Sequence, residues 1–126
     1  WGRIEVSPGS PAKTDYFLNA MYVCDNGCTR SERAVLLESE DFWGVQLLSH
    51  AVFFPKDEDV YGGEMILRID NTGRDPVRWH VTGLKGGVWS VISEGNKLCR
   101  SYVSDQSGVL TVTASQPELR FCYSRS

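Results

Sequence analysis

Hydrophobic and polar residues follow different patterns in the two halves of the chain. In the first half, apolar residues recur at roughly helical spacing: Ala34, Leu37, Val45 and Leu48. Thr29, followed three residues later by Glu32, matches the capping box that begins many helices. The pattern therefore predicts a helix from about residue 30 into the forties, although Gly44 would weaken its second half.

The second half consists of short β-prone runs separated by turn residues: 64–70, 77–82, 88–93, 98–104, 109–114 and 118–123. Before the helix, residues 21–24 are also β-prone, and Asp25-Asn26-Gly27 favours a tight turn. Residues 1–20 predict an N-terminal arm that could hold one strand, ahead of a single domain at 21–126. One helix followed by antiparallel strands predicts an α+β fold, with the N-terminal helix packed on a curved antiparallel sheet.

Composition narrows the class of protein. A chain of 126 residues with 41% hydrophobic content can form one buried core, which argues against disorder. The net charge of −3 disfavours wrapping of a phosphate backbone by bulk electrostatics. No apolar run reaches the ~18 residues that a membrane span requires, so we expect no membrane partner. Four cysteines favour an oxidising compartment and therefore secretion.

The cysteines also raise the question of a metal site. Cys24 and Cys28 loosely match the spacing of a zinc knuckle, but Cys99 and Cys122 lie too far apart in the sequence to complete it. We therefore expect no metal and no cofactor.

Several segments, taken in order, are similar to a known family. They are Phe54-Pro55-Lys56 with Tyr61 and Gly63, the run Val77–Val81, and the stretches 99–103, 108–113 and 119–122. Their order and spacing resemble the fungal guanyl-specific ribonucleases from about Tyr22 to Cys122. The resemblance implies a ribonuclease-like α+β scaffold.

The same resemblance implies that the catalytic positions have changed. The family's tyrosine corresponds to Phe54, its first histidine to Lys56, its general base to Arg78 and its general acid to Val112, whereas its arginine is retained as Arg100. A guanidinium cannot act as the base and a valine has no proton to donate. We expect a pseudo-ribonuclease without enzymatic activity. The one alternative for relocated catalysis is a pairing of His80 with Glu64.

A secreted ribonuclease-like domain without catalytic residues resembles the RNase-like effectors of powdery mildew fungi. The resemblance implies a monomer that is delivered into the plant cell, where it binds a host protein and can be recognised as an avirulence protein by an intracellular immune receptor of the NLR type. The alternative function is an RNA-binding module that uses the former active site.

The resemblance also implies a cationic cleft and a disulfide framework. Lys56, Arg78, His80 and Arg100 would line the cleft, with solvated surface residues as the alternative reading. Cys24 would bond Cys122. The remaining pair is Cys28 and Cys99, with a Cys24–Cys28 bond or two free thiols as alternatives.

Aromatic residues and loops supply the remaining candidates. Trp79 alternates with Arg78 and His80 and is expected in the core, as are Phe42-Trp43 and Phe53-Phe54. Trp89 follows two glycines and is the candidate aromatic for a partner contact, with packing at the sheet edge as the alternative. Arg74 lies in the polar loop 71–75, another candidate recognition element, and His50 is expected at the end of the helix or at the surface.

Overall fold

The computed structural model describes residues 3, 5–10, 12–15, 17–21, 23, 25–27, 33–57, 59–71 and 75–125. Within these ranges the chain forms nine strands and no helix. The strands are β1 (Val35–Glu38), β2 (Phe42–Leu47), β3 (His50–Pro55), β4 (Glu64–Arg68), β5 (Val77–Val81), β6 (Gly87–Ser93), β7 (Asn96–Val103), β8 (Leu110–Ala114) and β9 (Glu118–Ser124).

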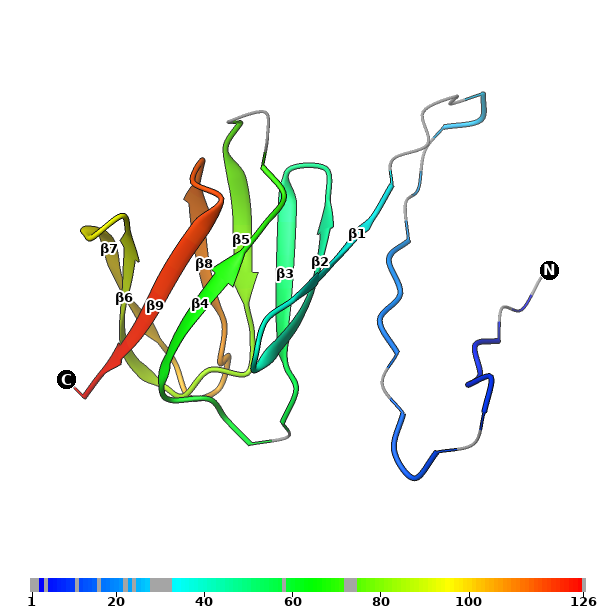
Figure 1. Cartoon of the computed structure of the whole chain (residues 1–126), viewed down its shortest axis with the longest axis horizontal. Coiled ribbons are helices and arrows are strands. Elements are labelled where there is room, and N and C mark those ends of the chain that lie inside the picture. The colour runs from blue at the N-terminus through cyan, green and yellow to red at the C-terminus, as the bar shows by residue number, and fades with distance from the viewer. Residues whose placement is uncertain are drawn as a thin grey trace.

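The strands form two sheets that pack face to face (Figure 1). The five-stranded sheet has the order β1-β2-β3-β5-β8, and the four-stranded sheet has the order β4-β9-β6-β7. All pairs are antiparallel except β3 with β5, which run parallel because the chain crosses to the other sheet through β4 between them. The protein is therefore an all-β sandwich.

The predicted α+β fold is wrong. The segment expected to be helical forms β1 and β2, and the capping residues Thr29 and Glu32 lie outside the described residues. The spacing of its apolar residues was misleading, because Leu37 is buried while Val45 lies on the opposite face. None of the described residues belongs to a helix long and apolar enough to cross a membrane.

The core lies between the sheets and is built by alternation along each strand. In β5 the buried residues Val77, Trp79 and Val81 alternate with Arg78 and His80, as a half-buried strand requires. Trp79 packs against Phe53 of its own sheet and Phe121 of the other, with ring centroids at 5.7 and 6.2 Å. The expectation that Trp79 is a core residue is confirmed, since its exposed fraction is 0%.

Gly44 in β2 has a packing role that explains its place inside a strand. It pairs directly with Phe53, whose ring lies over it, and a Cβ at this position would lie 2.7 Å from Phe53 Cδ1. The absence of a side chain therefore makes room for the Phe53 ring, which stacks on Trp79.

Candidate functional site

The outer face of the five-stranded sheet changes character from one edge to the other. The cross-strand register aligns Leu36, Val45, Val52, His80 and Thr111 in one row on that face. The first three residues of the row are apolar, and the last two can form hydrogen bonds. We call the outer face over β1, β2 and most of β3 the apolar half. The polar half lies over β5, β8 and the first residue of β3.

The apolar half borders a groove shared with the N-terminal arm. The groove has a volume of about 650 Å³, and its lining includes Phe17, Leu18 and Asn19 of the arm and Leu36, Trp43 and Phe54 of the sheet. Figure 1 shows the arm passing beside β1 and β2. Leu36 is 66% exposed and Phe54 40% exposed. Phe54 was expected in the core, but the strand alternation places its neighbour Phe53 there instead.

Lys56 lies at the end of the apolar half. Its Nζ donates a hydrogen bond to Glu38 Oε1 at 2.8 Å and lies 4.4 Å from the centroid of the Trp43 ring. The Lys56 ammonium group is therefore held by an ion pair with Glu38 and a cation–π contact with Trp43.

The polar half holds a group of side chains that we call the histidine patch: His50, Arg78, His80, Thr111 and Thr113. His50 pairs with Arg78 in the register, and Arg78 pairs with Thr113. His50 Nδ1 lies 3.2 Å from His80 Nε2, and the two rings stack at 5.5 Å. Thr111 Oγ1 lies 3.4 Å from His80 Nδ1, so both nitrogens of His80 face a polar partner.

The environment of His80 favours its neutral form. Burial lowers the pKa of the imidazole, and the nearby His50 and Arg78 lower it further because they repel the added positive charge. At 3.2 Å, one imidazole can donate its N–H to the other, whereas two protonated rings would place two donors against each other. The contact with His50 is therefore consistent with a neutral His80.

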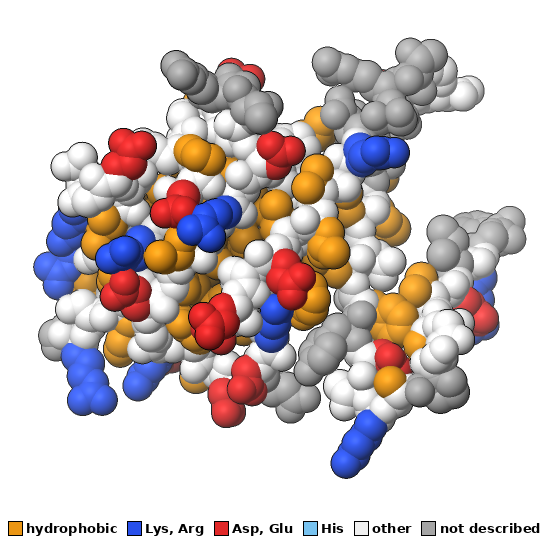
Figure 2. Space-filling view, viewed as in Figure 1, with side chains coloured by type: hydrophobic (Ala, Val, Ile, Leu, Met, Phe, Trp, Pro, Cys, Tyr) orange, Lys and Arg blue, Asp and Glu red, His pale blue; other side chains and the backbone are white. Residues whose placement is uncertain are grey.

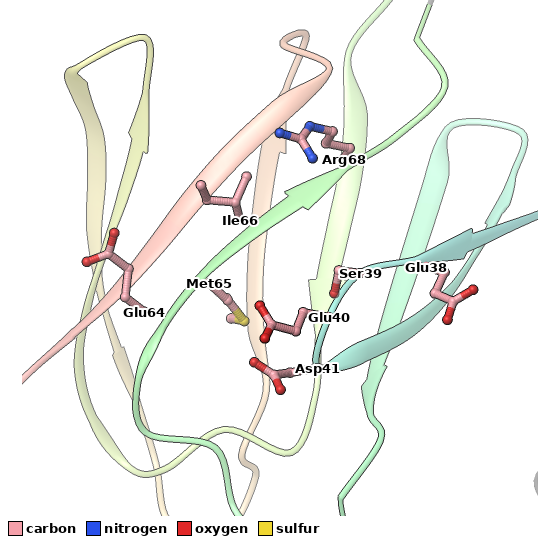
Figure 3. Close-up of a pocket in the computed structure, with 8 residues that line it drawn as sticks. All are labelled: Glu38, Ser39, Glu40, Asp41, Glu64, Met65, Ile66 and Arg68. Carbon is pink, nitrogen blue, oxygen red and sulfur yellow. The ribbon is translucent and has the colours of Figure 1, made fainter.

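A hollow at the opposite end of the sandwich is lined by acidic residues. It has a volume of about 390 Å³, and Figure 3 shows Glu40 and Asp41 of the β1–β2 turn facing β4, while Glu38 points away. Tyr61 donates a hydrogen bond to the carbonyl oxygen of Glu64 at 2.8 Å and also contacts Asp41. Burial and the neighbouring carboxylates raise the pKa of the Tyr61 hydroxyl. No group of three or more metal-ligating side chains occurs among the described residues.

The outer face of the four-stranded sheet carries paired charges. Arg68 bonds Glu118 at 2.6 Å and Arg120 contacts Glu64 at 3.4 Å, in both cases across β4 and β9. Figure 2 shows acidic and basic side chains interspersed over the face that these strands present. Arg100 pairs with Ser90 in the register and lies on this same outer face.

The structure does not bring the predicted cationic cleft together. Arg78 and His80 lie on the outer face of one sheet, Arg100 lies on the outer face of the other, and Lys56 is paired with Glu38 at the far end of β3. Val112 pairs with Trp79 and packs against the core. The alternative pairing of His80 with Glu64 does not form either, since they belong to different sheets.

Two other predicted recognition elements have different outcomes. Trp89 is fully buried, packs against Tyr123 and donates its Nε1 hydrogen to the carbonyl oxygen of Lys85 at 2.9 Å, so it cannot contact a partner. Arg74 lies outside the described residues.

The two cysteines in the sandwich face opposite sides of the four-stranded sheet. Cys99 pairs with Val91 on the core side and Cys122 pairs with Ser90 on the outer side, and neither forms a disulfide with another described residue. Burial and the nearby Glu64 raise the pKa of the Cys122 thiol. Cys24 and Cys28 lie outside the described residues, so the predicted disulfides stay predictions.

Sequence reasoning placed His50 at the surface but missed its contact with His80 and the apolar half of the sheet. A signal was available in the composition, because 42–47 and 50–55 are rich in the aromatic and β-branched residues that favour strands. The meeting of His50 with His80 had no local signal, because it depends on the parallel pairing of β3 with β5 across 30 residues.

Comparison with known proteins replaces the family that the sequence suggested. Residues 36–123 match the family described as Heparinase II C-terminal domain. No curated protein matches the chain. The resemblance to fungal ribonucleases is wrong, because the structure is all-β and the family match covers every strand except the first residue of β1 and the last of β9. The chain belongs to the Heparinase II C-terminal domain family.

Proposed function

We propose that this chain is a noncatalytic β-sandwich module of a larger, heparinase-type enzyme. In this role the apolar half of the five-stranded sheet docks against the part of the polypeptide that precedes the module. The observation that carries the proposal is the exposed apolar surface of Leu36, Trp43 and Phe54, which shares a groove with the N-terminal arm.

The position of the arm supports the choice of partner. Phe17 and Leu18 lie in the groove but remain 50% and 39% exposed, so the arm covers the apolar half only in part. By its description, the matching family is the C-terminal domain of a heparinase, and this supports a preceding domain as the occupant.

The energetics favour burial of this surface. Covering a large apolar side chain that is fully exposed contributes roughly 1.5–3 kcal/mol, and contiguous exposed apolar patches commonly mark interaction sites. Leu36 and Phe54, together with the half-buried Trp43, Val45 and Val52, provide such a patch on three adjacent strands. Over β4 and β9, the outer face of the four-stranded sheet instead carries two ion pairs, which suit an exposed surface.

The other functions expected from the sequence differ in the support that they retain. Absence of catalysis fits the proposal and remains part of it. Secretion remains a prediction from the cysteines. The roles as a host-targeted effector and as an RNA-binding module were implied by the ribonuclease resemblance, so they are now predictions without support of their own.

Hydrogen–deuterium exchange tests the docking. The exchange rates of β1, β2 and β3 would be compared between this chain alone and the full-length natural polypeptide. We expect slower exchange in these strands in the full-length protein and unchanged exchange in β6 and β7. Equal rates in β1–β3 in the two proteins would contradict the proposal.

A matched pair of substitutions sharpens this test. Leu36→Ser removes an apolar side chain from the proposed interface, whereas Leu98→Ser removes one from β7 of the other sheet. In the full-length protein, Leu36→Ser should lower the melting temperature and restore fast exchange in β1–β3. Leu98→Ser should leave that exchange slow.

A further inference from the structure

The histidine patch has the composition of an anion-binding surface. Arg78 supplies a planar guanidinium with several N–H donors, His50 and His80 supply imidazole nitrogens, and Thr111 and Thr113 supply hydroxyl groups. Arg78 and both threonines are exposed, and His80 is half-buried. Arg78, His50 and the two threonines can donate hydrogen bonds from one face to an oxyanion, while His80 has a polar partner at each ring nitrogen and positions His50 and Thr111.

The register brings these side chains within reach of one extended ligand. Thr113, Arg78 and His50 occupy adjacent positions on β8, β5 and β3, so successive members of this row are about 5 Å apart. His80 and Thr111 form the next row, about 7 Å along the strands. The patch is therefore open and spans several oxyanion groups, a size that suits repeating charges along a polymer.

Arg78 is one of the cations of the sandwich that form no ion pair among the described residues. Among the described residues, no carboxylate forms an ion pair with Arg78, whereas Lys56, Arg68 and Arg120 each have one. The acidic residues Glu40 and Asp41 lie in the β1–β2 turn, at the opposite end of β3 from His50 (Figure 1). An anion can therefore approach Arg78 without displacing a described acidic partner.

We propose that the histidine patch binds the sulfate or carboxylate groups of an acidic polysaccharide. The choice of a polysaccharide rests on the proposed function, since a module of a heparinase-type enzyme would meet such a polymer. The patch adjoins the apolar half in the same row of residues, so a polymer held there would run along the border of the proposed docking interface. The ligand groups are recognised by the charge of Arg78 and by hydrogen bonds from Arg78, His50 and the threonine hydroxyls.

Binding of this chain to dextran sulfate and to polygalacturonate, measured by titration calorimetry, tests the proposal. Arg78→Ala should weaken binding by roughly 10- to 100-fold, because a charge-assisted contact to the oxyanion is lost. Arg100→Ala is the matched control: it removes the same charge from the outer face of the other sheet and should change affinity less than twofold. Circular dichroism confirms that both variants are folded.

The outcomes separate the alternatives. Loss with Arg78→Ala for one or both polymers supports the site and identifies sulfate, carboxylate or both as the recognised group. Equal losses with Arg78→Ala and Arg100→Ala would show a bulk charge effect and overturn the proposal. The proposal would also be overturned if the chain bound neither polymer, or if it bound RNA more tightly than it binds both polymers. The Leu36→Ser substitution, which tests docking, does not change the histidine patch. A failure of the docking proposal would therefore leave the polymer-binding result unchanged.

Discussion

The two outer faces of the sandwich are built from similar strands but differ in how their charged side chains are satisfied. On the four-stranded sheet, Arg68 and Arg120 pair with glutamates across β4 and β9. On the five-stranded sheet, the described carboxylates leave Arg78 unpaired, and Leu36 is largely exposed. Over β4 and β9 the charges therefore neutralise one another, whereas the five-stranded face combines a guanidinium without a described ion pair with exposed apolar area.

The largest effects should come from the inner faces and should be alike in the two sheets. Phe53 of the five-stranded sheet and Phe121 of the four-stranded sheet are both essentially buried and both contact Trp79. Phe53→Ala and Phe121→Ala should each lower the free energy of unfolding by about 3–5 kcal/mol, because each leaves a cavity. Urea denaturation measures this. A loss below about 1 kcal/mol for one of them would mean that its sheet contributes little to the core.

A smaller difference is expected between the two buried tryptophans. Trp89 donates its indole hydrogen to the carbonyl oxygen of Lys85, whereas Trp79 Nε1 has no hydrogen-bond partner among the described residues. Trp89→Phe should therefore cost about 1–3 kcal/mol for the lost hydrogen bond, in addition to the cavity that both substitutions create. Thermal unfolding would show a lower melting temperature for Trp89→Phe than for Trp79→Phe. The reverse order would be inconsistent with this hydrogen-bond pattern.

Removing a charge should lower stability slightly on the four-stranded face and leave it nearly unchanged on the five-stranded face. Glu118→Gln removes the partner of Arg68 and should lower the free energy of unfolding by about 0.2–1 kcal/mol, an effect that salt screens. Arg78→Gln should change stability by less than about 0.5 kcal/mol, because no described ion pair is broken. Denaturation at low and high salt distinguishes the two variants. A salt-dependent loss with Arg78→Gln would reveal an acidic partner for Arg78.

The smallest effect concerns pH and belongs only to the five-stranded face. The pKa of His80 is lower in the folded protein than in the unfolded chain, so the unfolded chain binds the proton more readily. Its contribution to stability is present above the unfolded pKa of about 6.5 and is lost as the pH falls through the lower folded pKa. His80→Gln should reduce the drop in melting temperature between about pH 7.5 and pH 5.5. An unchanged drop would show that His80 is not responsible for it.

The sequence by itself determined most of the strands. The runs predicted after residue 64 correspond to β4 through β9, because alternating apolar residues bounded by turn residues report a local backbone preference. The same local reasoning identified Trp79 as a core residue. It failed at β1 and β2, where short apolar runs satisfied a helical spacing about as well as a strand period, and Gly44 was a packing feature rather than a weak point in a helix.

Only the tertiary structure decided which strands share a sheet and which side of each sheet faces the core. Trp89 was expected at a surface and is buried, while Phe54 was expected in the core and is exposed, because each assignment depends on one register position. Arg78 and Arg100 were expected in one cleft and lie on opposite outer faces, whereas His50 and His80 come together through the parallel pairing of β3 with β5. These placements arise from contacts between segments far apart in the chain, and residue spacing carries no record of such pairings.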